Sequence, residues 1–188
     1  MFHYSRSALA LFCIALAISW ASSLRAADYT WAGMGKVKAG VPAGWTVEAG
    51  TDTSRRFHLK LTAPAGRKAG LQLTMVRGSE VISSRSELEA SLLKSLEGSS
   101  ALTGSVEGKA ELLKLPMDAG IGCYAQFTDK NLVGKAAAAT EFRLLRMVQG
   151  IMDARVLVSA SLVFDDATQP EVEEMMAMLK TLKIELAP

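Results

Sequence analysis

The amino-acid sequence predicts one α+β domain, in which several strands form a sheet and two longer helices pack against it. Residues 56–62 and 71–76 alternate apolar and polar side chains, which is typical of strands that bury one face. Residues 84–97 and 168–183 place apolar side chains three and four positions apart, which is typical of helices that bury one face. The chain has 188 residues and neither an internal repeat nor a low-complexity linker, so one domain with a packed core is expected.

The strand and helix near the C-terminus give the clearest pattern. Residues 154–164 are rich in β-branched and apolar side chains and are expected to form a mostly buried strand. Thr168 is the expected N-cap of the following helix, Glu171 completes a capping box, and Pro170 suits the first turn. The apolar positions of this helix form one stripe, which consists of Val172, Met175, Met176, Leu179 and Leu182. A helix with a single apolar face after a buried strand is expected to lie on the sheet.

Shorter patterns complete the expected sheet. The segment 41–45 contains a proline and a glycine that favour a turn, after which Trp45 is expected to return to the core. The short linker between 56–62 and 71–76 favours an antiparallel hairpin. Further strands are expected at 36–39, 46–49, 102–106, 110–115, 121–128 and 141–149, with Pro116 as a stop.

The helix expected at 84–97 has its own start signal and apolar face. Ser86 and Glu89 are spaced as a capping box. Its buried face is expected to contain Leu88, Leu92, Leu93 and Leu96. Later in the chain, residues 135–139 have no pattern and are expected to form a loop.

The N-terminal segment 1–26 has the features of a secretory signal peptide. Arg6 supplies positive charge, residues 8–21 form a nearly continuous apolar run, and small residues follow. The run is short for a membrane span, so a retained anchor helix is the less favoured alternative. We expect cleavage between Ala21 and Ala26, a location in the periplasm or outside the cell, and no membrane insertion after processing.

Removal of this leader would leave a nearly neutral chain. Without Arg6 and Arg25, the formal balance changes from 21 basic and 19 acidic residues to 19 of each. The electrostatic attraction to nucleic acid that a basic protein has is therefore not expected. Cys13 would be lost with the leader, so Cys123 would have no partner within the chain for a disulfide.

Two aromatic residues are the candidate partner-binding residues. Residues 27–35 contain Tyr29 and Trp31 without any periodicity, and we expect an extended arm that precedes a domain at 36–184. The two side chains either pack on the edge of the domain, which we favour, or contact a partner.

The sequence contains few residues that suggest catalysis. After leader removal His58 and Cys123 are the only histidine and cysteine, so a thiol enzyme would have to use both. His58 lies on the polar face of an expected strand and Cys123 lies in an apolar strand, so a solvated histidine and a small buried cysteine are the favoured interpretation.

No cofactor or metal site is predicted. Asp165 and Asp166 with three following glutamates could bind calcium, but they also suit the positive end of a helix dipole, which is the simpler explanation. The thioether groups of the methionines could bind copper(I), which is an alternative to their packing in the core. Met175 and Met176 lie on the expected core stripe, whereas Met178 is expected to lie off it.

The order of these elements resembles the PsbP-like fold, which is shared by PsbP, DcrB and related small exported bacterial proteins. The resemblance rests on Val-Pro-Ala-Gly-Trp at 41–45, Leu-Gln-Leu-Thr at 71–74 before a helix, and the helix ending at 178–184. It implies a central antiparallel sheet flanked by helices, an α/β/α sandwich, and it implies accessory or docking roles without a catalytic signature.

We therefore expect an exported, non-enzymatic accessory or binding domain of the bacterial cell envelope that engages a protein partner. Two alternatives remain open at this stage. One is a small thiol-dependent enzyme that uses Cys123 and His58, and the other is a carrier of an apolar ligand held between sheet and helix.

Overall fold

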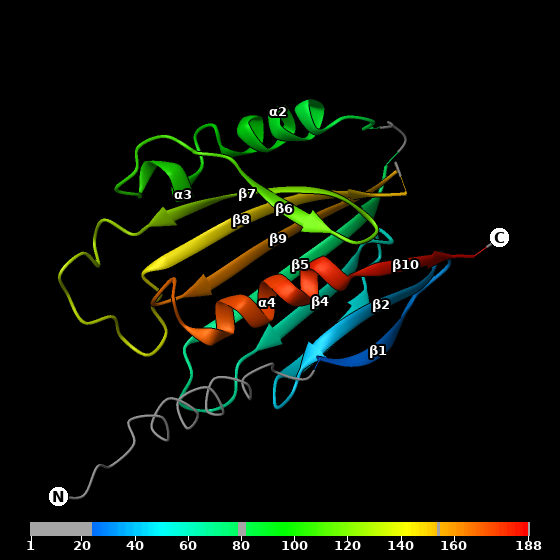
Figure 1. The fold of residues 1–188 in the computed structure, drawn as a ribbon, viewed down its shortest axis with the longest axis horizontal. Coiled ribbons are helices and arrows are strands. Elements are labelled where there is room, and N and C mark those ends of the chain that lie inside the picture. Colours follow the sequence, from blue (N-terminus) through cyan, green and yellow to red (C-terminus); the bar gives the residue numbers. More distant parts are fainter. Residues whose placement is uncertain (1–23, 79–81, 154, 188) are drawn as a thin grey trace, which may run out of the picture.

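The computed structural model describes residues 24–78, 82–153 and 155–187. Strands are the predominant regular structure in this part of the chain, and Figure 1 shows their arrangement. The strands are β1 (Leu24–Trp31), β2 (Gly35–Pro42), β3 (Thr46–Thr51), β4 (Phe57–Thr62), β5 (Ala69–Arg77), β6 (Leu113–Met117), β7 (Gly120–Thr128), β8 (Leu144–Met152), β9 (Val156–Phe164) and β10 (Lys183–Leu186). The helices are α2 (Arg85–Leu96), α3 (Ser100–Thr103) and α4 (Pro170–Thr181).

The larger sheet has seven antiparallel strands in the order β3-β4-β5-β9-β8-β7-β6. The predicted hairpin between 56–62 and 71–76 is confirmed, because β4 and β5 pair with Leu59 opposite Leu73. Side chains along β4 alternate strictly between buried and exposed, as period-two patterning requires. The alternation in the sequence therefore correctly predicted which side chains of β4 are buried.

The smaller sheet has the order β1-β2-β10 and joins the two ends of the described chain. The segment 27–35, expected to be an extended arm outside the domain, instead contributes most of β1, which pairs with β2 along its whole length. The expected strand at 36–39 is confirmed as part of β2. The arm is thus part of the folded unit, because pairing satisfies its backbone groups and buries Trp31.

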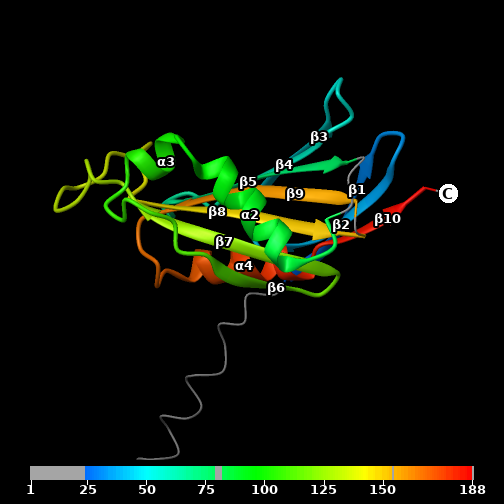
Figure 2. The ribbon, with the colours of Figure 1, turned by 90° about the horizontal axis from the view of Figure 1, so that it is seen from above.

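Helices cover less of the sheet than the sequence led us to expect. Figures 1 and 2 show α2 and α4 on opposite sides of the seven-stranded sheet. On the α4 side, β2 and its neighbours share the cover with the helix, and together they enclose the larger apolar cluster. On the other side, α2 packs on β7 and β8 over a smaller cluster. The expectation of an antiparallel sheet is confirmed, whereas a sandwich flanked chiefly by helices was an overstatement.

Three strand predictions need correction. The segment 102–106 is not a strand, because Leu102 lies in α3 and Ser105 makes an isolated bridge to Asp129. Pro116 does not stop β6 but lies inside it, which is tolerated because β6 is an edge strand and proline lacks only the donor that faces away from the sheet. The strand predicted at 141–149 exists as β8, and it begins three residues later because Leu144 is the first residue that pairs with β7.

The start of α2 also differs from the prediction. Ser84 is the N-cap: its side chain accepts a hydrogen bond from the backbone N–H of Glu87, and the Glu87 carboxylate accepts one from the backbone N–H of Ser84. The capping box thus lies two residues before the predicted pair, Ser86 and Glu89. Three of the four predicted core leucines are buried, and Leu93 is 43% exposed because it faces away from the sheet.

The helix α4 buries more than its predicted stripe. Gln169 is its N-cap and makes no side-chain capping bond, so the box predicted for Thr168 and Glu171 does not form. Met178, expected to lie off the stripe, is fully buried. It packs in the larger cluster because β2 of the small sheet packs against the helix in addition to the strands of the large sheet.

None of the helices in the described part of the chain has the length and apolar character needed to cross a bilayer. The predicted signal peptide lies almost entirely outside the described residues, which begin at Leu24.

Candidate functional site

A long connection at one end of the large sheet is the most distinctive surface feature. Residues 129–143 join β7 to β8 and contain no helix or strand. The connection is nevertheless folded on itself: Asp129 accepts a hydrogen bond from Asn131 N at 2.8 Å, and Glu141 accepts one from Ala138 N at 2.9 Å. Leu132 is 9% exposed and anchors the loop to the domain. Long connections inside compact domains are more often functional than short ones.

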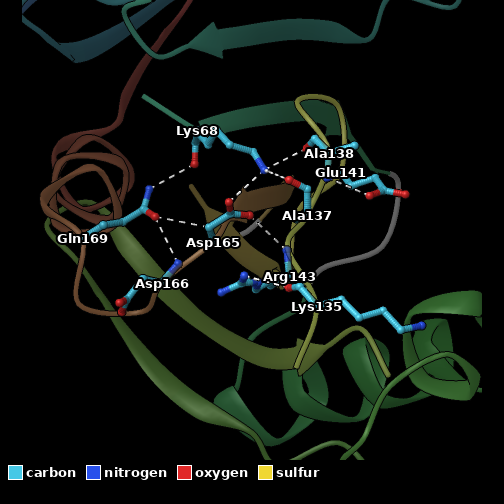
Figure 3. Close-up of polar contacts among 9 residues, drawn as sticks. All are labelled: Lys68, Lys135, Ala137, Ala138, Glu141, Arg143, Asp165, Asp166 and Gln169. Carbon is cyan, nitrogen blue, oxygen red and sulfur yellow. Dashed lines mark hydrogen bonds and ion pairs between the residues drawn. The ribbon is translucent and has the colours of Figure 1, made fainter. Parts of the chain in front are cut away.

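Lys68 attaches this loop to the rest of the protein (Figure 3). Its Nζ donates to the carbonyl of Ala138 at 2.9 Å and lies 2.8 Å from Oδ2 of Asp165. The same Nζ lies 5.8 Å from the centre of the Phe142 ring, which is within the range of a cation–π contact. One ammonium group therefore connects the loop to the segment between β9 and α4.

Asp165 and Gln169 complete the connection. Oδ1 of Asp165 accepts the backbone N–H of Arg143 at 3.3 Å, while Nη2 of Arg143 donates to the carbonyl of Lys135 at 2.8 Å. Oε1 of Gln169 accepts the backbone N–H groups of Asp165 and Asp166, and its Nε2 donates to the carbonyl of Lys68 (Figure 3). The loop is thus held by side chains from two other connections, the one between β4 and β5 and the one between β9 and α4.

Beside the loop lies a hollow of about 470 Å³. Its floor is apolar and comes from three adjacent strands, with Phe127 from β7, Leu145 from β8 and Val163 from β9. Ala101 and Gly104, in and just after α3, line one wall, and the rim is polar, with Asp129, Asn131 and Arg143. The volume is in the range of pockets that bind small molecules or a partner's side chains. We call the hollow together with residues 129–143 the loop-end site.

Two exposed valines lie close in sequence to residues of the hollow: Val106 follows Gly104 by two residues, and Val133, in the loop itself, follows Asn131 by two. Val106 is 59% exposed and Val133 is 57% exposed, the two largest values among the exposed large apolar side chains of the described chain. Their segments are in contact, because Lys130 N donates to the carbonyl of Gly104 at 3.1 Å. Apolar side chains beside an apolar hollow with a polar rim are typical of surfaces that bind another molecule.

Glu107 attaches the Val106 segment to β7. Its carboxylate accepts hydrogen bonds from Thr128 N at 2.9 Å and from Thr128 Oγ1 at 2.7 Å. Partial burial alone would raise the pKa of Glu107, but these bonds outweigh that effect, so its pKa is lowered.

The predicted partner-binding residues lie elsewhere and are packed. Trp31 is 1% exposed, and its Nε1 donates to the carbonyl of Arg55 at 2.8 Å. Tyr29 is partly buried and, like Trp31, its ring packs against Phe57. In the structure both side chains pack on the domain, which is the interpretation that we favoured.

The structure does not bring His58 and Cys123 together. They lie in β4 and β7, with β5, β9 and β8 between them. Cys123 is completely buried, and burial raises the pKa of its thiol to about 11. His58 Nε2 lies 3.0 Å from Asp52 Oδ2, and its Nδ1 lies 3.1 Å from Thr74 Oγ1. A thiol nucleophile would need a base beside it, and His58 is too far from Cys123 to serve as that base.

The acidic cluster is divided between two unrelated roles. Asp165 and Asp166 belong to the connection described above, whereas Glu171 and Glu174 are buried at 6% and 7% exposure. Oε1 of Glu171 lies 3.2 Å from Nη1 of Arg67, and Oε2 of Glu174 accepts a hydrogen bond from Trp45 Nε1 at 2.7 Å. Within the described residues, no group of three or more acidic, histidine or cysteine side chains is placed to hold a metal ion. Met175 and Met178 lie in the apolar core.

Sequence reasoning missed the loop-end site, apart from predicting a loop at 135–139. Its lining residues come from α3, from the ends of three strands and from the loop, and no motif connects them. The one feature of the sequence that could have indicated this site is the long stretch without periodicity at 129–140, between two expected strands.

Comparisons with known proteins give information on the fold. No family model matches the sequence, and no curated protein was found to match it. The chain is similar to the solution structure of cyanobacterial PsbP (CyanoP) from Synechocystis sp. PCC 6803, with a TM-score of 0.48 and 11% sequence identity. The match covers 89% of this chain and 96% of that chain. The protein of that structure carries the PsbP name that the sequence resemblance also gave.

Proposed function

We propose that this chain is an exported, non-enzymatic binding domain of the bacterial cell envelope that engages a protein partner at the loop-end site. The observation that carries the proposal is the combination of an apolar hollow of about 470 Å³ with an ordered loop beside it. A partner would insert an apolar side chain onto the floor formed by Phe127, Leu145 and Val163.

The attachment of the loop supports this role. Lys68 and Asp165 hold the loop before a partner arrives, so less conformational entropy is lost on binding than with a mobile loop. The exposed Val106 and Val133 would add apolar area around the hollow, and Arg143, Asp129 and Asn131 would form the polar rim that interfaces commonly have.

The export part of the proposal rests on the leader pattern at 1–26. A periplasmic or extracellular location follows from that pattern. Edman sequencing of the secreted protein, or mass spectrometry of its intact mass, tests it: a mature form that starts between residues 22 and 27 supports export, and an unprocessed cytosolic form contradicts it.

The absence of catalysis is supported by the surroundings of Cys123. A thiol whose pKa is raised to about 11 is almost wholly protonated at neutral pH, and the thiolate is the reactive form. We expect native protein to resist iodoacetamide at pH 7 over hours, with rapid alkylation after unfolding in urea. Fast alkylation of the native protein would favour the alternative of a thiol enzyme.

Partner capture with matched variants tests the binding site. The double substitution Val106→Asp and Val133→Asp places charges beside the hollow, while Val76→Asp changes a valine that is 37% exposed on β5, away from it. In cross-linked envelope extracts, we expect the same protein to be recovered with the wild type and the Val76→Asp control and to be lost with the double variant. Equal recovery with all three would overturn the proposed site.

An apolar ligand is the second candidate for the same hollow, because its floor is apolar. Native mass spectrometry of gently purified protein distinguishes the two. A co-purifying lipid-sized mass that Leu145→Asp removes would favour a carrier, and an empty protein with a captured partner favours the binding domain.

A further inference from the structure

The side of the large sheet that carries α2 is only half covered. The helix packs on β7 and β8, where Leu88, Leu92 and Leu96 meet Cys123, Ala125 and Phe127. On β4 and β5 none of the helices in the described residues covers the same face, and Lys60, Gln72 and His58 are exposed there. Figure 2 shows α2 near the β7 side of the sheet. The face therefore divides into an apolar, covered half and a polar, open half.

The open half contains two hollows that adjoin. One of about 280 Å³ lies at the edge of α2 and is lined by Ser95, Gln149, Ser159 and Ser161. The other, of about 350 Å³, lies over β3 to β5 beside His58, Lys60 and Glu48. Gln72 and Thr74 line both. We call the two together the polar trough.

Strand register explains why these side chains form a continuous surface. Gln149 pairs with Ser159, Ser159 pairs with Thr74, and Thr74 pairs with His58. Residues paired in this way point to the same face, and successive strands are about 4.8 Å apart. One row of polar groups thus crosses four strands from the edge of α2 to the outer part of the sheet.

Gln149 is the anomaly in this row. Its side chain is 8% exposed, and its Oε1 has no hydrogen-bond partner in the described structure. A buried acceptor without a donor loses its hydrogen bonds to water without replacement, so such groups are rare in protein interiors. The adjoining hollow gives the amide room to turn toward a donor that arrives from outside.

The lining restricts the chemistry of that donor. The hollow beside Gln149 has only hydroxyl and amide side chains among its polar groups. The ionisable side chains at the far end already have partners: Lys60 Nζ lies 3.3 Å from Glu48 Oε1, and His58 Nε2 lies 3.0 Å from Asp52 Oδ2. A charged ligand would therefore find no free counter-charge among the described residues of the trough.

Peptide recognition has different requirements. It generally uses a sheet edge, an apolar groove, an aromatic-lined groove or a cluster of arginines. The polar trough reaches the edge strand β3 at its outer end, and Leu92 and Met147 contribute apolar lining, but its hydroxyl and amide side chains lie on the face of the sheet and its lining includes no arginine. A neutral molecule with many hydroxyl groups satisfies hydroxyl and amide side chains in both directions, as donor and as acceptor.

We propose that the polar trough binds a neutral carbohydrate, with a sugar hydroxyl donating to Gln149 Oε1 and successive sugar units occupying the two hollows. The site is separate from the loop-end site, so it does not depend on the protein partner proposed above. It would make the domain a link between an envelope glycan and a protein.

Titration of the full chain with named oligosaccharides tests this proposal. The probes are chitotetraose and maltotetraose, two neutral tetrasaccharides, with a Gly-Ser octapeptide as the competing ligand class. We expect one of the sugars to shift the backbone amide NMR signals of Ser159, Ser161 and Thr74. No shift with either sugar at millimolar concentration, or shifts in this row with the peptide alone, would overturn the carbohydrate assignment.

Substitutions distinguish binding from a structural role. Gln149→Leu keeps the volume and removes the acceptor, so we expect at least tenfold weaker sugar binding with an unfolding temperature equal to or above that of the wild type. Gln72→Ala changes an exposed side chain and should also weaken binding at least threefold, whereas Lys114→Ala on β6 is the control and should leave it unchanged. Wild-type affinity in both trough variants would contradict the proposal. If Gln149→Leu does not fold, wild-type affinity of Gln72→Ala contradicts it.

Discussion

The two faces of the seven-stranded sheet are built differently. On the α4 side, the helix and the strands β1, β2 and β10 close the larger apolar cluster, in which Trp31, Phe57 and Leu179 are almost completely buried. On the α2 side, one helix covers a smaller cluster and leaves half of the face to solvent. The comparison suggests that the α4 side supplies most of the stability, while the α2 side provides surface for binding. Both proposed sites lie on the α2 side.

The largest expected effect is the loss of a core side chain on the α4 side. Leu179→Ala should lower the free energy of unfolding by about 4 kcal/mol, because it removes a fully buried side chain and leaves a cavity that its neighbours cannot fill. Urea denaturation followed by circular dichroism measures this. A loss below about 1 kcal/mol would show that the α4 side is not the main source of stability.

The corresponding change on the α2 side should have a smaller effect. Leu92→Ala also removes a buried side chain, but it does so from the smaller cluster, and we expect a loss of about 2 kcal/mol. Hydrogen exchange should show that α2 amides lose protection before those of β5 and β9. An effect equal to that of Leu179→Ala would remove the distinction between the two sides.

Acid should loosen α2 before α4. The backbone N–H groups of Ser83 and Ser84 donate to Glu87 and lower its pKa, so the capping contribution is present above the ordinary value of 4.5 and is lost as the pH falls through the lower folded value. The N-cap of α4 has no side-chain bond to lose. Hydrogen exchange at pH 5 and pH 3 checks this difference.

A Glu87→Gln variant is the control for that experiment. Its α2 protection should change less between pH 5 and pH 3 than that of the wild type, since the charged form is absent at both values. Equal loss of protection in both proteins would assign the acid effect to another group.

The smallest expected effect concerns the open half of the α2 side. Lys60 and Glu48 form a pair at 3.3 Å whose side chains are 48% and 67% exposed. Lys60→Ala should change the free energy of unfolding by less than about 1 kcal/mol, since exposed ion pairs contribute little. A larger loss in urea denaturation would mean that this half is needed for folding, and its role as a binding surface would lose support.

The sequence predicted those parts of the fold that follow from local periodicity. β4, β5, β7 and β9 have a regular pattern or a dense apolar composition, and each was located within two residues. The α2 N-cap was misplaced because Ser84 and Ser86 offer the same local chemistry, and at α4 the Thr168 hydroxyl donates to Asp166 while Gln169 takes the N-cap position. Met178 was misjudged because its burial depends on β2, a strand of the small sheet that packs against α4.

The binding sites could not be predicted in the same way. The buried Glu171 and Glu174 are satisfied by Arg67 and Trp45, which lie about a hundred residues earlier in the chain. The loop-end site combines α3 with three strand ends, and the polar trough depends on the register of four strands. Such sites arise from tertiary contacts, and a single sequence without a catalytic motif contains little signal for them.

The pairing of β1 bears on the leader removal that we propose. Leu24, Arg25 and Ala26 pair with Pro42, Val41 and Gly40, and the Leu24 side chain lies against Gly40. A peptidase that cuts after Ala21 would leave all three pairs in the mature protein, whereas one that cuts after Ala26 would shorten the outer strand of the small sheet by three rungs. The choice among neighbouring scissile bonds would then decide how firmly the N-terminus is fastened to the domain.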